Sequence, residues 1–127
     1  EHSPLLDTLK WLSQKKVRVI ITTDHGTIRV KRPSKVIGDR NTNTNLRYKQ
    51  GKNLNFIGKD VFHIKNPQDA QLPKLHVSSS YIFAKEDTYF VYPNNYNHFV
   101  NYFNGTFQHG GISLEEIIIP FATYSAK

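Results

Sequence analysis

The sequence predicts an α/β fold, with a mainly parallel β-sheet flanked by helices. Residues 17–23 (VRVIITT) form a short apolar, β-branched run, which Asp24, His25 and Gly26 close at once. Such a run, bounded by turn residues, is typical of a strand buried on both faces, the kind that parallel sheets contain. A helical pattern leads directly into this run, and Ile117–Ile119 provides a second apolar strand candidate. Together these features indicate αβ units.

The first element is a helix that begins at the N-terminal end. Ser3 is suited to the N-cap and Pro4 to the first helical position. The apolar residues that recur at helical spacing are Leu5, Leu6, Leu9 and Leu12.

The middle of the chain predicts short strands and loops. Thr27–Lys31 is expected to be a strand that ends at Pro33, and Val36 and Ile37 add a short extended piece. The polar stretch 39–45 lacks a hydrophobic period and predicts a loop. Another strand is expected at Val61–Ile64, and a single helical turn at Asn66–Asp69.

A small β-hairpin insertion is predicted next. The β-rich runs Ser79–Ala84 and Thr88–Tyr92 flank the polar turn Lys85–Asp87. Aromatic residues alternate along both runs, so they could form a stacking platform for bases; a core face with a polar back is the commoner arrangement. These aromatic residues are Tyr81, Phe83, Tyr89, Phe90 and Tyr92.

Two further features are expected near the C-terminal end. Asn95–Phe103 predicts a short helix that Gly105 ends. Ser113 and Glu116 stand at the spacing of a capping box, which starts a helical turn at Ser113.

Composition limits the possible chemistry. The 127 residues correspond to one domain or part of one, and a net charge of +7 favours anionic partners, although charge of this size also serves solubility alone. The absence of cysteine excludes disulfides and thiolate ligands, so a metal would have to use His and carboxylates. The sequence also lacks methionine, a membrane-length apolar run and a signal-peptide pattern. We therefore expect a cytoplasmic fragment of a longer chain.

Three residues are candidate metal ligands. Asp24 and His25 fall at the carboxyl end of the first strand, where ligands bind in open α/β sheets. A carboxylate beside an imidazole suits Zn²⁺. Both can serve one metal only if the strand has stopped, and Gly26 offers the backbone freedom for that turn. His109 lies on a glycine-flanked loop just before a predicted helix start. Taken alone, the three residues are more readily interpreted as a turn Asp, a His with satisfied hydrogen bonds and a loop His.

The motifs TTDHG (22–26) and QHGGISLEEIIIPF (108–121) together resemble the alkaline phosphatase superfamily, and more narrowly the C-terminal part of a PglZ domain. Spacing and composition look closest to the PglZ effector domain of PorX-type response regulators of Bacteroidetes. The resemblance implies an alkaline-phosphatase-like sheet with two zinc ions, one bound by Asp24 and His25 and its neighbour by His109. The upstream motifs of that family, including the nucleophile, are absent, as is a receiver domain. Thr22 and Thr23 do not match the nucleophile's position.

The resemblance implies phosphoester hydrolysis in the full-length protein and a role in signalling control of type IX secretion. The basic charge favours an anionic substrate such as an oligonucleotide or a cyclic nucleotide. Arg47 and Lys49 are the candidate substrate phosphate contacts, because Arg offers a bidentate fork; alternatively, they are two solvated loop cations. Expected partners are a sensor kinase, regulatory proteins and a second copy in a homodimer, with no membrane. We expect the fragment alone to be inactive.

Two other functions remain open. The chain could be a basic module without metal that binds nucleic acid or an acidic protein. It could also be a protein-interaction effector whose metal site is structural. The remaining histidines have ordinary interpretations, as terminal, half-buried or surface residues: His2, His63, His76 and His98.

Overall fold

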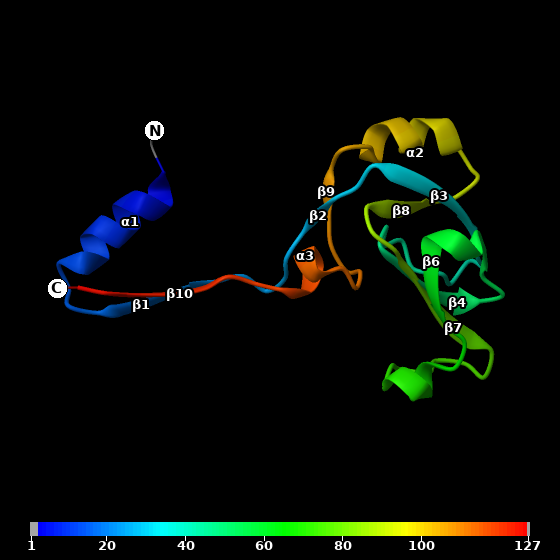
Figure 1. Ribbon diagram of the computed structural model, residues 1–127, viewed down its shortest axis with the longest axis horizontal. Helices are drawn as coiled ribbons and strands as arrows, with labels where there is room; N and C mark the ends of the chain where they lie inside the picture. The colour runs from blue at the N-terminus through cyan, green and yellow to red at the C-terminus, as the bar shows by residue number, and fades with distance from the viewer. Residues whose placement is uncertain (1–2, 127) are drawn as a thin grey trace. The chain divides into compact units, whose positions relative to one another are not determined.

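The computed structural model describes residues 3–126, which fall into two compact units (Figure 1). Of the described residues, 3–24 and 119–126 form the first unit, and 25–118 form the second. Each unit is described by itself. Among the described residues, no helix is both long enough and apolar enough to cross a membrane.

The first unit holds one helix and a two-stranded antiparallel ribbon. The predicted helix is confirmed as α1 (Pro4–Ser13), with Ser3 at the N-cap and Pro4 at its start. The strand after it, β1 (Arg18–Thr22), pairs with β10 (Phe121–Ser125) in antiparallel register from Arg18–Ser125 to Thr22–Phe121. The expected buried parallel strand is therefore wrong. The side chains of β1 alternate between exposed and half-buried, and Ile20 is 55 % exposed, because the described residues supply only one neighbouring strand.

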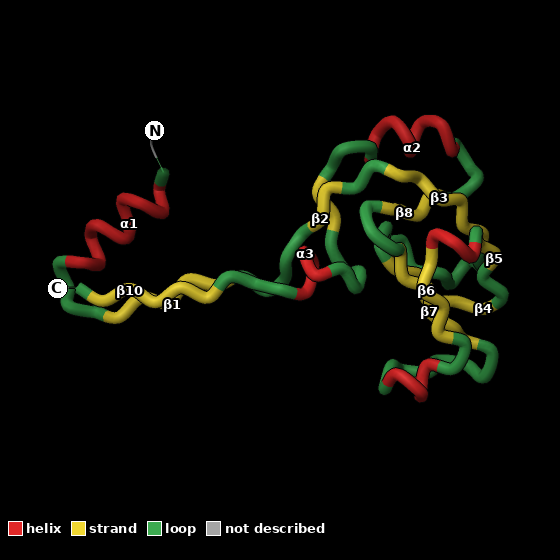
Figure 2. The backbone as a smooth tube through the Cα atoms, in the orientation of Figure 1, coloured by secondary structure: helices red, strands yellow, loops and turns green. Residues whose placement is uncertain are grey.

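The second unit is built from short strands in three small sheets (Figure 2). Their orders are β2–β9, β5–β3–β8 and β4–β7–β6. The strands are β2 (Ile28–Arg29), β3 (Arg32–Ile37), β4 (Tyr48–Lys52), β5 (Asn55–Phe56), β6 (Val61–Ile64), β7 (Ser79–Ala84), β8 (Thr88–Val91) and β9 (Phe107–Gln108). The helices are the α-helices α2 (Tyr96–Phe103) and α3 (Leu114–Ile117) and the 3₁₀ turns Gly58–Asp60 and Pro67–Ala70.

The expected mainly parallel sheet does not form. Among the described strand pairs, β3 with β8 is the only parallel one. The fold is a mixed α/β arrangement in which antiparallel pairing dominates. A continuous apolar run indicates burial on both faces, but it does not fix the direction of the neighbouring strand, and this is why the prediction failed.

The predicted hairpin is also wrong, although both of its strands exist. β7 pairs with β4 and β6, whereas β8 pairs with β3. The turn between them is held by the start of β3: the backbone N–H groups of Lys31 and Arg32 donate to the Asp87 carbonyl at 2.9 and 3.2 Å. The Arg32 guanidinium also pairs with Glu86 and Asp87. These contacts direct β8 onto β3 instead of back onto β7.

Two smaller expectations need correction. Pro33 does not end a strand but lies inside β3, opposite Tyr89 in the parallel ladder. Residues 117–119 do not form a strand: α3 extends to Ile117, and β10 begins only after Pro120. The loop at 39–45, β6, the turn after Asn66 and the helix after Asn95 occur as predicted.

The core of the second unit lies on both sides of β8, whose residues are all buried. Phe90 packs with Val36 and Ile82 on one side, whereas Tyr89 and Val91 pack with Val30 on the other. The aromatic residues of the two runs therefore serve the core where they are buried, as the commoner interpretation held; these are Tyr81, Tyr89 and Phe90. β8, which is buried on both faces, supports the candidate site.

Candidate functional site

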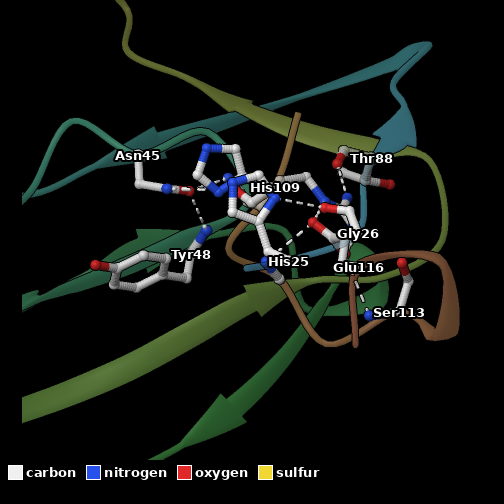
Figure 3. Close-up of polar contacts among 10 residues, drawn as sticks. His25, Gly26, Asn45, Tyr48, Thr88, His109, Ser113 and Glu116 are labelled. Atoms are coloured by element: carbon white, nitrogen blue, oxygen red, sulfur yellow. Dashed lines mark hydrogen bonds and ion pairs between the residues drawn. The ribbon is translucent and has the colours of Figure 1, made fainter. Parts of the chain in front are cut away.

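The short ladder between β2 and β9 brings two of the predicted ligands together. Ile28 pairs with Gln108 and Arg29 with Phe107, so the chain on either side of this ladder carries His25 and His109 to the same place. Their imidazole rings stack, with centroids 3.7 Å apart and planes inclined by 10° (Figure 3). His25 is half-buried and His109 exposed. Two side chains from distant parts of the sequence thus form one imidazole pair.

The hydrogen bond of His25 fixes its tautomer. Nδ1 of His25 lies 2.9 Å from the carbonyl oxygen of Gly26. A carbonyl can only accept, so Nδ1 carries the proton, and in the neutral ring Nε2 carries the lone pair. A backbone carbonyl behind one ring nitrogen is the usual arrangement for a metal-binding histidine.

Gly26 is needed for close approach of two backbones. Its N–H donates to the Glu116 carbonyl at 2.9 Å. A Cβ at this position would stand 2.0 Å from the Glu115 carbonyl oxygen and 3.1 Å from that of Ile118. The sequence suggested that Gly26 supplies freedom for a turn, but its backbone is not among the positive-φ positions. The requirement for glycine here comes from the α3 backbone beside it.

Behind the imidazole pair lies a buried ion pair between Arg47 and Glu116. Arg47 Nε and Nη2 donate to Glu116 Oε1 and Oε2, each at 2.9 Å, and Nη1 donates to the Thr88 carbonyl. Both side chains are almost completely buried, with exposed fractions of 0 % and 1 %. Bidentate geometry of this kind is the strongest form of a carboxylate–guanidinium contact.

Glu116 also holds the glycine-rich loop that follows His109. Its Oε1 accepts the Gly111 N–H at 2.9 Å, and its Oε2 accepts the Ser113 N–H at 3.2 Å. The second of these bonds is part of the capping box predicted for α3. Each carboxylate oxygen therefore accepts one guanidinium and one backbone N–H. Glu116 thus connects the segments that carry both histidines, one through its backbone and the other through its side chain.

The ionisation of Glu116 reflects this environment. Burial by itself raises the pKa of its carboxyl group. Hydrogen bonds from Arg47 and Ser113, the charge of Arg47 and the Gly111 N–H outweigh burial, so the pKa lies below its ordinary value. Glu116 is therefore the charged partner that Arg47 requires.

Asn45 provides a further link between this support and His109. Its Oδ1 accepts the backbone N–H groups of Arg47 and Tyr48 at 2.7 and 3.2 Å. Its Nδ2 donates to the His109 carbonyl at 3.3 Å. Gly110, which follows His109, has a φ of +98° and packs against the Asn45 amide. Asn45 thus joins the entry to β4 to the loop that carries His109 (Figure 3).

Comparison with known protein families shows the family of this chain. The family model of the BREX system PglZ alkaline phosphatase-like domain matches residues 4–124. The chain belongs to the PglZ family. No curated protein matches it. The family match covers the two motifs that carry the predicted ligands, and it confirms the broader resemblance found in the sequence.

The structure places the other predicted site residues of this PglZ chain as follows. Asp24 is the last residue of the first unit and is exposed. Arg47 and Lys49 are not solvated loop cations, because they are 0 % and 1 % exposed and Lys49 lies in β4. Their contact with a substrate phosphate stays a prediction. Among residues 3–126, no group of three or more His, Asp or Glu side chains is arranged to hold a metal ion.

Sequence reasoning missed the residues that support the imidazole pair. Glu116 was expected only as the N3 residue of a capping box, and Asn45 only as part of a polar loop. A capping box does turn the N3 carboxylate back toward the start of its helix, which is a usable signal for Glu116. Nothing in the spacing of Arg47 and Glu116 identifies them as partners, because their contact depends on tertiary structure.

Proposed function

We propose that this PglZ chain supplies metal ligands to a metal-dependent phosphoesterase domain, with zinc as the metal. His25 and His109 would be ligands, together with Asp24, which precedes His25 in the sequence. In the complete domain two zinc ions are proposed, as the sequence resemblance implies. The observation that carries this proposal is the stacked pair of imidazoles, built from two segments far apart in the chain.

The donor chemistry of the pair fits zinc. His25 presents Nε2 as its lone-pair nitrogen because Nδ1 donates to the Gly26 carbonyl. The sequence resemblance assigns one ring to each ion, His25 to the first and His109 to its neighbour. When bound, zinc would supply Lewis-acid stabilisation of charge on a phosphoryl oxygen.

The residues of this chain have separable parts in that function. His25 and His109 bind; Glu116, Arg47 and Asn45 position the segments that carry them. The net charge of +7 favours an anionic substrate, and an oligonucleotide or a cyclic nucleotide is proposed. The nucleophile is proposed to come from a segment of the full-length protein outside this chain. A phosphate contact by Lys49 or Arg47 remains part of the proposal.

The biological setting proposed for the domain rests on the sequence resemblance alone. The motifs look closest to PorX-type response regulators, so the domain is proposed to act as an effector under a sensor kinase, with a role in type IX secretion. A homodimer is proposed in the same way. The family match supports the PglZ domain itself and extends to none of these partners.

Zinc titration by isothermal calorimetry tests the proposal. Wild-type chain is expected to bind zinc, and both His25→Ala and His109→Ala to weaken binding at least tenfold. His76→Ala is the matched control because His76 is exposed and outside the site. Equal affinity in wild type and both site variants would refute the proposal. An equal loss in His76→Ala would show that zinc binds to surface histidines in general.

A basic module without metal is the second candidate, and the net charge of +7 is the observation that favours it. This function predicts binding of an oligonucleotide that weakens steeply with salt and is unaffected by a chelator. The phosphoesterase proposal predicts instead that a chelator removes the effect of zinc on oligonucleotide binding. A fluorescence anisotropy titration with and without chelator separates the two.

A further inference from the structure

A second site is suggested by a small cavity in the second unit, between β8 and α2. The cavity measures about 230 Å³, and neither the two histidines of the imidazole pair nor Glu116 lines it. Phe99 and Phe103 of α2 supply aromatic walls, and Thr44, Lys49 and Tyr92 are its polar residues.

 The cavity is therefore mostly apolar, with one cationic side chain among its lining residues.

Lys49 is buried in this cavity wall without an acidic partner. It is 1 % exposed, and its Nζ donates to the Asn43 carbonyl at 2.9 Å and lies 4.4 Å from the centre of the Tyr92 ring. The Tyr92 hydroxyl donates to the same carbonyl at 3.0 Å. None of the ion pairs among the described residues involves Lys49. A buried ammonium group of this kind is costly unless an anion pairs with it.

Burial also changes the acidity of this ammonium group. Desolvation lowers the pKa of Lys49 to about 8, from an ordinary value of 10.5. No nearby carboxylate opposes the effect of burial, in agreement with the absence of an ion pair. Near neutral pH the group is still mostly protonated, so it can attract an anion.

The size of the cavity limits what it can hold. An apolar cavity of about 150 Å³ is enough for a benzene ring, whereas drug-sized ligands need about 300–1,000 Å³. A cavity of about 230 Å³ fits one ring and one small acidic group. The aromatic walls suit a flat apolar body, and the buried ammonium group suits a carboxylate.

We propose that this cavity binds a small aromatic carboxylate, with the ring against Phe99 and Phe103 and the carboxylate on Lys49. The cavity uses neither the imidazole pair nor Glu116, so its test does not depend on zinc binding. Lys49 is the residue that it has in common with the proposed function, where Lys49 is considered as a phosphate contact. The ligand would supply the negative charge that the protein does not place beside Lys49.

Benzoate is the probe, and benzyl alcohol is its uncharged counterpart. In methyl NMR spectra of the wild-type chain, benzoate is expected to shift the Leu46 and Val91 resonances, which belong to cavity residues. Val19 lies in the first unit and should not shift. Shifts spread evenly over these methyl groups, or no shift at millimolar benzoate, would overturn the proposal.

Variants test the role of the ammonium group. Lys49→Met is expected to weaken benzoate at least tenfold while leaving benzyl alcohol unchanged. Lys59→Met, which removes the same charge from an exposed position, should have no effect. Equal benzoate affinity in wild type and Lys49→Met would refute the proposal, as would an equal loss in Lys59→Met. Phe103→Trp keeps Lys49 and fills the cavity, so it should also abolish benzoate binding; retained binding would contradict the proposed location.

Discussion

Replacing Glu116 by Gln tests the support of the imidazole pair most sharply. The substitution preserves the size of the side chain but exchanges one carboxylate oxygen for an NH₂ group. Each oxygen of Glu116 accepts one N–H of Arg47 and one backbone N–H, from Gly111 or Ser113. Whichever way the Gln amide turns, its NH₂ group therefore faces two donors and loses two hydrogen bonds.

The expected loss of stability follows from these contacts. The Arg47 side chain remains buried, at 0 % exposure, with no negative partner. Removing one member of a buried ion pair costs about 3–5 kcal/mol, because the other charge stays uncompensated. We expect Glu116→Gln to lower the free energy of unfolding by this amount.

Urea unfolding followed by far-UV circular dichroism provides the measurement. Glu115→Gln is the matched control, since Glu115 is the adjacent residue and its side chain is exposed; its cost should stay below about 0.5 kcal/mol. Arg47→Met combined with Glu116→Gln should cost less than the sum of the two single substitutions, with a coupling of about 0.5–3 kcal/mol. A cost below 1 kcal/mol for Glu116→Gln, or strict additivity with Arg47→Met, would refute the reasoning.

Three further predictions concern stability. Gly26→Ala should cost about 1–3 kcal/mol in urea unfolding, because its Cβ would stand 2.0 Å from the Glu115 carbonyl oxygen; an unchanged midpoint would contradict this close approach. Because the fold lowers the pKa of Lys49 to about 8, the unfolded chain binds more protons between pH 8 and 10.5. Stability should therefore rise across this window, by at most about 3 kcal/mol, and Lys49→Met should lack this rise in urea melts. Because the fold lowers the pKa of Glu116, the contribution of its carboxylate to the free energy of unfolding is fully present above pH 4.5 and is lost as pH falls through the lower folded pKa. The free energy of unfolding of wild type, measured from neutral to acid pH, should therefore fall more than that of Glu116→Gln. An equal fall in both proteins would exclude this contribution.

Local features of the fold could be predicted from the sequence because they depend on neighbouring residues. Ser3 and Pro4 mark the start of α1, and the spacing of Ser113 and Glu116 marks α3. The family resemblance also depends on short local motifs, and the match over residues 4–124 confirms it at the level of the PglZ domain.

The pairing of strands could not be predicted in the same way. β7 and β8 were placed correctly, but the choice of partner depends on Arg32 and on backbone contacts from Lys31 to the turn. The parallel sheet was inferred from an apolar run, which reports burial and not strand direction. β1 pairs with only one described strand, so its exposure also differs from the prediction.

In the candidate site, too, the sequence predicted local features but not long-range contacts. The types of the metal-binding candidates were read from the sequence, whereas the approach of His25 to His109 depends on the two-residue ladder between β2 and β9. Arg47 was noticed for its charge, but its burial against Glu116 depends on the packing around Thr88. Long-range partners of this kind leave no periodic signal in a single sequence.

Histidine side-chain ¹⁵N NMR during a zinc titration tests the central claim most directly, because it reports both the tautomer and the ligating nitrogen. Before zinc is added, His25 should show a protonated Nδ1, as its hydrogen bond to the Gly26 carbonyl requires. Zinc should then shift His25 Nε2 and a ring nitrogen of His109 while leaving His76 unchanged. A protonated Nε2 in His25, or zinc-induced shifts confined to other histidines, would contradict the account.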